Sequence, residues 1–321
     1  MIEQDIANID SLIIHDMQTN AEYLRQVAVY FTEHQEPRLH LDILLLSLKM
    51  INYQGQSHLQ TGVILEYVFS ATQLHNDTME QKIRCQDEVL NQGLKGTNSR
   101  ILVGDFFYSR AFYLMSKLGE LKVVSHLCNA INQYIEGQIQ QIFHTDDSIA
   151  LEQMYFQGLK RKSCLYYTSV TQVVGVLGNC TKADNQALCD YGLHLGMAVQ
   201  TIEETLCCIR GNEAGQHKQF NLSFVMIRGL QQATPALRQL IYAVIAKQPV
   251  SAHSVESAKL IRQICIQTDA LAYTRAQIEV QIKRARQAIV VFPESIYRLA
   301  LQNIATKLLV QFDQDLAKVG L

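Results

Sequence analysis

The chain has 321 residues, of which 48% are apolar and 18% are charged. These fractions are ordinary for a globular protein with a large core, and they exclude a disordered or low-complexity chain. The formal net charge of −2 argues against a nucleic-acid or anionic-membrane surface, although it says nothing about local patches.

The amino-terminal residues and the cysteines indicate the cellular compartment. Residues 1–12 carry acids where a signal peptide would carry bases. No run of about 18 apolar residues is present to span a membrane. None of the eight cysteines has the spacing of a metal site, which favours reduced thiols. We therefore expect a cytoplasmic protein with no transmembrane segment and no nucleic-acid partner.

Long helices are the expected elements. No proline lies between Pro37 and Pro235, and a proline inside a helix removes a backbone donor and clashes with the preceding turn. Apolar residues recur at helical spacing, and no strand pattern of comparable length is present. The sequence therefore predicts an all-α protein. Its expected helices span residues 5–31, 59–76, 99–119, 121–143, 191–208, 220–231, 235–247, 252–265, 269–290 and 294–317.

The stretch 65–112 carries the most informative pattern. Three polar residues close one helical segment and a four-residue run opens the next: Asn76, Asp77 and Glu80, then Leu102, Val103, Gly104 and Asp105. Without a gap, this frame resembles the trans-polyprenyl diphosphate synthases, which have Asp-Asp-x-x-Asp and Leu-Val-Gly-Asp at these places. The resemblance implies the isoprenoid synthase fold, a single domain over residues 1–321 with antiparallel helices around a central cavity.

The resemblance also implies a magnesium site built from two motifs. In the family, aspartates of both motifs hold magnesium on hard oxygens and so neutralise the departing diphosphate. The corresponding residues here are Asn76, Asp77 and Glu80 in the first motif and Glu203, Glu204 and Cys207 in the second. An amide is neutral, and a thiol is a soft ligand that suits magnesium badly. We expect Mg²⁺ to bind weakly or not at all, with Asp77, Glu80, Glu203 and Glu204 as the remaining carboxylates.

Diphosphate binding is expected to be weakened as well. Cys85 and Gln86 stand where the family has two arginines, so two permanent positive charges are missing. The same register places four residues on the family's diphosphate-binding and substrate-binding positions, namely Arg38, His58, Lys162 and Gln200. Arg38 and His58 are alternatively surface residues at helix starts, and Lys162 is alternatively part of a solvated basic face.

Two small residues bear on product length. In the family, a bulky aromatic residue four or five places before the first aspartate floors the cavity for the growing prenyl chain. Ala71 and Thr72 hold these places here, which implies a deep pocket of the octaprenyl, heptaprenyl or geranylgeranyl type. The alternative is that Ala71 merely packs against a neighbouring helix.

Replacements in both metal motifs and in the diphosphate site lead to one functional hypothesis. We expect a protein of isoprenoid biosynthesis that binds a prenyl diphosphate or isoprenoid and is weakly active or non-catalytic. It would act as a partner subunit in a homodimer or in a heterodimer with an intact family member, and no single residue is assigned as catalytic. The alternatives are an active trans-prenyltransferase that condenses isopentenyl diphosphate with an allylic diphosphate, and an isoprenoid-binding protein without diphosphate chemistry.

Overall fold

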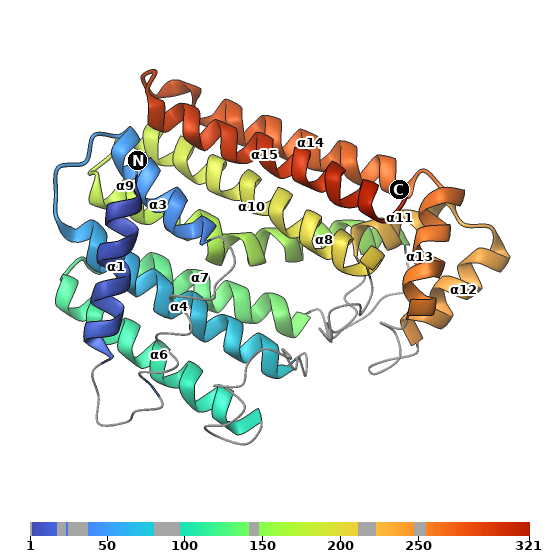
Figure 1. Cartoon of the computed structure of the whole chain (residues 1–321), viewed down its shortest axis with the longest axis horizontal. Coiled ribbons are helices and arrows are strands. Elements are labelled where there is room, and N and C mark those ends of the chain that lie inside the picture. The colour runs from blue at the N-terminus through green and yellow to red at the C-terminus, as the bar shows by residue number, and fades with distance from the viewer. Residues whose placement is uncertain are drawn as a thin grey trace.

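The computed structural model describes residues 2–17, 24, 38–79, 97–140, 148–210, 223–246 and 255–321. Within these residues every regular element is a helix, so the predicted all-α fold is confirmed. The long helices lie in layers, mostly parallel or antiparallel to one another (Figure 1). They are α1 (Glu3–Asp16), α3 (Leu39–Met50), α4 (Ser57–Met79), α6 (Thr97–Leu118), α7 (Leu121–Gln140), α8 (Ser148–Ser163), α9 (Ser169–Leu177), α10 (Lys182–Arg210), α11 (Phe224–Gln232), α12 (Pro235–Ala246), α13 (Val255–Gln267), α14 (Ala270–Ala288) and α15 (Ile296–Lys318).

Two short elements interrupt this series. The π-helical turn η1 (Cys164–Thr168) joins α8 to α9, and the 3₁₀ turn η2 (Ile289–Val291) follows α14. Single π turns inside helices are rare and often occur at functional sites. Among the described helices, none combines the length and the apolar character needed to cross a bilayer.

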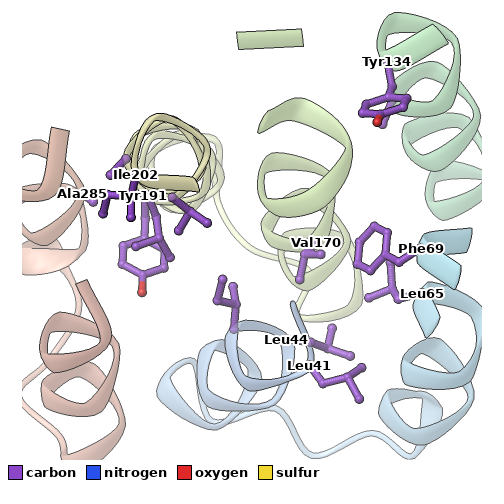
Figure 2. Packing of buried hydrophobic residues seen from close by; sticks show 14 of the residues in the cluster. Leu41, Leu44, Leu65, Phe69, Tyr134, Val170, Tyr191, Ile202 and Ala285 are labelled. Atoms are coloured by element: carbon purple, nitrogen blue, oxygen red, sulfur yellow. The ribbon is translucent and has the colours of Figure 1, made fainter. Parts of the chain in front are cut away.

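Helix α10 forms the centre of the packing. It contacts α8, α9, α13, α14 and α15, and its buried residues lie on several of its faces. Tyr191 and Ile202 project from it into the core that also contains Leu44 and Val170 (Figure 2). Burial of one such side chain contributes roughly 1.5–3 kcal/mol relative to exposure. The Tyr191 hydroxyl keeps a partner inside the core, because it donates to the Leu301 carbonyl oxygen at 3.0 Å.

Glycines allow α10 to lie close to the π turn. A Cβ atom on Gly192 would stand 2.6 Å from the carbonyl oxygen of Tyr167, and one on Gly196 would stand 2.9 Å from the Ser163 Cβ. Because a backbone oxygen cannot move aside without disturbing η1, Gly192 has no room for a side chain. The close contact fixes the position of η1 relative to α10.

The expected helix boundaries agree with the structure best in the carboxyl-terminal half. Each expected helix from 220 to 317 corresponds to one of α11 to α15, with ends that differ by a few residues. The expected first helix over 5–31 is wrong in its length, because α1 ends at Asp16 and Met17 caps it. Apart from Leu24, which is helical, the rest of the expected range 18–31 lies outside the described residues.

Candidate functional site

The second motif contains a carboxylate with internal partners at both oxygens. Glu204 on α10 accepts hydrogen bonds at Oε1 from Lys162 Nζ at 3.1 Å and from Gln200 Nε2 at 3.1 Å. Its Oε2 accepts a hydrogen bond from the Tyr155 hydroxyl at 2.8 Å. Lys162 and Tyr155 both belong to α8, so these contacts join α8 to α10. The structure thus brings together three of the residues predicted from the sequence, Lys162, Gln200 and Glu204.

Burial controls the protonation of the tyrosines beside this motif. Burial raises the pKa of the Tyr155 hydroxyl well above its usual value, and the Glu204 carboxylate raises it further. Tyr155 therefore remains a protonated donor at neutral pH. Glu203, one position before Glu204, is exposed. Its charge adds to the effect of burial, which raises the pKa of Tyr166 and of Tyr167.

The first motif contains a neutral triangle of hydrogen bonds. Asn76 on α4 donates through Nδ2 to the hydroxyl of Tyr134 on α7. Gln138, one turn along α7, donates from Nε2 to Asn76 Oδ1 at 3.2 Å and to the Tyr134 hydroxyl at 2.9 Å. Both polar atoms of the Asn76 amide thus have partners within the protein. Glu80, together with Cys85 and Gln86, lies outside the described residues, as does the Asp77 side chain.

Aromatic rings connect the two motifs. Tyr166 of the π turn packs edge-on against Tyr134, with ring centroids 5.7 Å apart, and lies 5.0 Å from the Phe69 ring. The π turn η1, which carries Tyr166, also packs against α10. The Tyr166 side chain therefore lies between the α4–α7 pair and α10. The sequence signal for this residue is the dipeptide Tyr166-Tyr167, which was missed.

Arg38 is part of a buried charged cluster. Its Nε donates to Glu66 Oε2 at 2.9 Å, and another guanidinium nitrogen is paired with Asp10 of α1. His40 Nε2 also lies 2.9 Å from Glu66 Oε2. Although burial alone would raise the pKa of Glu66, His40 and Arg38 together bring it below its usual value. Arg38 is consequently not a surface residue, because its side chain is buried between two acids.

His58 lies apart from the motifs. Its Nε2 is 3.8 Å from Asp5 Oδ1, and the other oxygen of Asp5 pairs with Lys49 at 2.9 Å. His58 is on the first turn of α4 and Asn76 is near its last turn. The 18 positions between them correspond to about 27 Å along a helix. The structure therefore does not bring His58 together with Asn76.

The two small residues of the predicted chain-length pocket face α6. Ala71 and Thr72 are both buried, and the Thr72 hydroxyl lies 2.7 Å from that of Tyr108. A Cβ atom on Gly104 of α6 would stand 3.3 Å from the Ala71 carbonyl oxygen, so the two helices approach closely here. The deep pocket stays a prediction. The structure has a pocket of about 510 Å³ elsewhere, lined by Cys265, Ile266, Leu271, Arg275, Asp313 and Leu316 among others.

The described donors fit a magnesium ion poorly. Within the described residues, no three or more histidine, cysteine, aspartate or glutamate side chains come together as a metal site. Glu204 offers hard oxygens of the kind magnesium prefers, yet Lys162, Gln200 and Tyr155 engage both of them. Cys207 offers sulfur, which is a soft ligand. The Asp77 and Glu80 side chains are outside this test.

Comparison with known proteins identifies the family. Residues 21–262 match the family model described as polyprenyl synthetase, and the chain belongs to this family. It is 27% identical to octaprenyl diphosphate synthase of Escherichia coli (strain K12) over 308 residues, which cover 94% of each chain. These findings confirm the resemblance to trans-polyprenyl diphosphate synthases.

Solved structures confirm the fold. A decaprenyl diphosphate synthase from Rhodobacter capsulatus is 24% identical, covers 97% of each chain and superposes with a TM-score of 0.83. A polyprenyl synthase from Caulobacter crescentus CB15, complexed with calcium and isoprenyl diphosphate, is 22% identical, with 96% of this chain and 95% of that chain covered and a TM-score of 0.84. The isoprenoid synthase fold is therefore that of this chain.

Proposed function

We propose that this chain is a weakly active or non-catalytic member of the polyprenyl synthetase family. It binds a prenyl diphosphate or isoprenoid and acts as a partner subunit, either with a second copy or with an intact family member. The observation that carries this proposal is the engagement of Glu204 by Lys162, Gln200 and Tyr155. The proposal treats residues 1–321 as one domain working in the cytoplasm.

The Glu204 contacts oppose metal binding for an electrostatic reason. A magnesium ion bound to Glu204 would either lie beside the Lys162 ammonium, where the two cations repel each other, or displace it. Displacement leaves Lys162 buried without its counterion, and breaking one partner of a buried ion pair costs roughly 3–5 kcal/mol. A metal at this motif must therefore overcome a cost that carboxylates exposed to water would not impose.

The described cations at the predicted diphosphate positions are already compensated. Lys162 pairs with Glu204 at 3.1 Å, and Arg38 pairs with both Glu66 and Asp10. A diphosphate approaching either cation also meets the carboxylates that neutralise it. The loss of preorganised positive charge weakens stabilisation of a leaving diphosphate, and such a term can be worth several kcal/mol in a barrier.

Exposed apolar residues support the partner role. Leu102 on α6 is 61% exposed, and Phe112 and Tyr113 of the same helix are also exposed. Ile135 and Ile139, four residues apart on one face of α7, are exposed too. Exposed apolar side chains on α6 and α7 favour contact with another protein. A homodimer and a heterodimer both fit this surface.

The decisive test is turnover by the purified chain. With isopentenyl diphosphate, an allylic starter and magnesium, we expect elongation to be very slow or absent, and calorimetry should detect only weak magnesium-dependent binding of pyrophosphate. The matched control restores the family's residues while leaving the rest of the chain unchanged. It combines Asn76→Asp, Glu80→Asp, Cys85→Arg, Gln86→Arg, Glu203→Asp, Glu204→Asp and Cys207→Asp.

The proposed function and its alternative predict different activities for the unmodified chain and the restored variant. The restored variant should elongate faster than the unmodified chain if the fold supports the reaction. The alternative is an active enzyme that uses Asp77, Glu80, Glu203 and Glu204 as its metal set. Turnover by the unmodified chain at roughly 1 per second or faster would establish that alternative and refute the proposal.

A further inference from the structure

The turn between α14 and α15 exposes a cluster of aliphatic side chains. Val291 of η2 is 66% exposed, and Ile296 and Leu299 at the start of α15 are 59% and 56% exposed. Val290 is exposed beside them, whereas the neighbouring Phe292 is buried. Ile296 and Leu299 are three residues apart, so they share one face of α15. We call the four exposed residues Val290, Val291, Ile296 and Leu299 the apolar tip.

Hydrogen bonds fix the tip in this conformation. Arg298 donates to the Phe292 carbonyl oxygen at 2.6 Å and to the Val290 carbonyl oxygen at 3.3 Å. Ser295 caps α15, because its hydroxyl accepts from the Arg298 backbone N–H at 3.1 Å. These bonds hold the turn on both sides of its proline. The fixed turn therefore keeps the aliphatic side chains of the tip exposed.

Basic residues precede the tip along α14. Lys283, Arg284 and Arg286 are all exposed on the last turns of α14. Lys283, Arg286 and Val290 follow one another at spacings of three and four residues, so this basic face leads directly into the tip. Glu294 is the only acid between positions 280 and 310, and Arg298 pairs with it at 3.0 Å. The segment 280–310 has five basic residues and one acid, a net charge of +4, whereas the whole chain has −2.

This combination matches the surface of an anionic bilayer. Aliphatic side chains bury themselves at the boundary between headgroups and acyl chains, and basic residues gain roughly 1 kcal/mol each near anionic lipids. A single apolar or electrostatic signal gives marginal binding, so stable contact needs both. The tip projects from the end of the molecule where α10 begins (Figure 1). A projecting tip offers no groove for a peptide, and its charge complements an anionic surface.

We propose that the α14–α15 turn is a contact site for an anionic lipid bilayer, with the apolar tip inserted and Lys283, Arg284 and Arg286 facing the headgroups. The site does not depend on whether the chain turns over prenyl diphosphates. The predicted contact lies at the end of α10 opposite to Glu203 and Glu204, so the candidate site stays away from the lipid surface.

Vesicle flotation of the full chain tests the proposal. Vesicles of phosphatidylcholine mixed with phosphatidylglycerol should carry the chain upward at low salt, and vesicles of phosphatidylcholine alone should not. Salt at about 0.5 M should release it, because the Debye length falls to a few ångströms. Combining Lys283→Gln, Arg284→Gln and Arg286→Gln should lower the partition coefficient about a hundredfold. Val291→Ser with Ile296→Ser should lower it about tenfold or more.

Control variants make the same kinds of substitution on other helices. Lys117→Gln, Lys122→Gln and Lys259→Gln remove three exposed charges from other helices, and Ile266→Ser removes an aliphatic side chain that is 72% exposed on α13. These variants should float like the unmodified chain. Absence of flotation with anionic vesicles, or equal losses in tip and control variants, would overturn the proposal. A lower molar mass in solution for the tip variants would do so too, because the tip would then be a contact between proteins.

Discussion

The candidate site has two halves, the first motif and the second motif with their partners. They differ in the kind of bond that their side chains make. Asn76, Tyr134 and Gln138 form hydrogen bonds between neutral groups across α4 and α7. Glu204 and Lys162 join α8 to α10 through opposite charges. A neutral hydrogen bond contributes about 1 kcal/mol, whereas removal of one member of a buried ion pair costs several times more. The second half is therefore the larger obstacle to rebuilding a metal site, even though the sequence keeps two carboxylates in each half.

The largest expected effect comes from removing the cation of the second half. Lys162→Met should lower the free energy of unfolding by about 3 kcal/mol, because Glu204, whose side chain is only 14% exposed, would keep only neutral donors. Chemical denaturation measures the loss. Lys160→Met on the same helix is the matched control and should change stability by less than about 0.5 kcal/mol. Adding Glu204→Gln to Lys162→Met should recover most of the loss, and failure to do so would argue against the ion pair as its cause.

The Arg38 cluster extends the comparison to a second carboxylate, Glu66. Because the pKa of Glu66 in the folded state lies below its ordinary value of 4.5, its contribution to stability is present above pH 4.5 and is lost as the pH falls through the folded-state pKa. Glu66→Gln should destabilise the protein at neutral pH by about 1–3 kcal/mol. The difference from the unmodified chain should shrink in acid. Denaturation curves at several pH values test this, and a constant difference down to pH values well below 4.5 would contradict it.

A smaller effect is expected in the neutral half. Tyr134→Phe removes the hydroxyl that accepts from both Asn76 and Gln138. The loss should be about 1 kcal/mol, because the two amides keep their bond to each other and water can reach the partly buried group. Thermal denaturation of Tyr134→Phe, Lys162→Met and the unmodified chain ranks the two losses of stability. A loss for Tyr134→Phe equal to that for Lys162→Met would remove the distinction between the two halves.

The smallest stability effect is expected for Asn76→Asp. The new carboxylate can still accept from Gln138, and the Tyr134 hydroxyl can reverse its role and donate to it, so the change should stay within about 0.5 kcal/mol. Calorimetry should nevertheless show stronger magnesium binding than in the unmodified chain, because a hard charged oxygen replaces a neutral one. Glu204→Asp is the corresponding change in the second half. It should strengthen magnesium binding less than Asn76→Asp does, since Lys162 remains beside the carboxylate. The reverse order would show that the second half is the easier one to restore.

Sequence reasoning predicted the fold well because its signals are local. The absence of prolines from Pro37 to Pro235 and the apolar periodicity of the last hundred residues or so each depend on neighbours along the chain. The register named Glu204 as a metal residue and Lys162 and Gln200 as substrate-binding residues, and these roles stay predictions. The structure places the three side chains in contact, and for Gln200 and Glu204 this follows from their shared helix face.

Contacts between distant helices could not be predicted in this way. Arg38 and Glu66 are 28 positions apart, and nothing in either segment indicates that one pairs with the other. Nothing along the chain indicates that the Tyr155 hydroxyl has a carboxylate partner, because Glu204 lies on another helix. His58 was grouped with the substrate-binding residues by counting along the chain, and that role stays a prediction. The length of α4 separates it from Asn76.

The packing of α10 has a consequence for how the molecule opens. Its 29 residues correspond to about 43 Å of continuous helix at 1.5 Å per residue, and other helices contact it along much of that length. Amide hydrogens near Gly192 and Gly196, where η1 lies against the backbone, should exchange with deuterium only when the whole protein unfolds. Amides of α1 should exchange through local opening, because far fewer helices cover it. A hydrogen-exchange profile would therefore mark α10 as the slowest element.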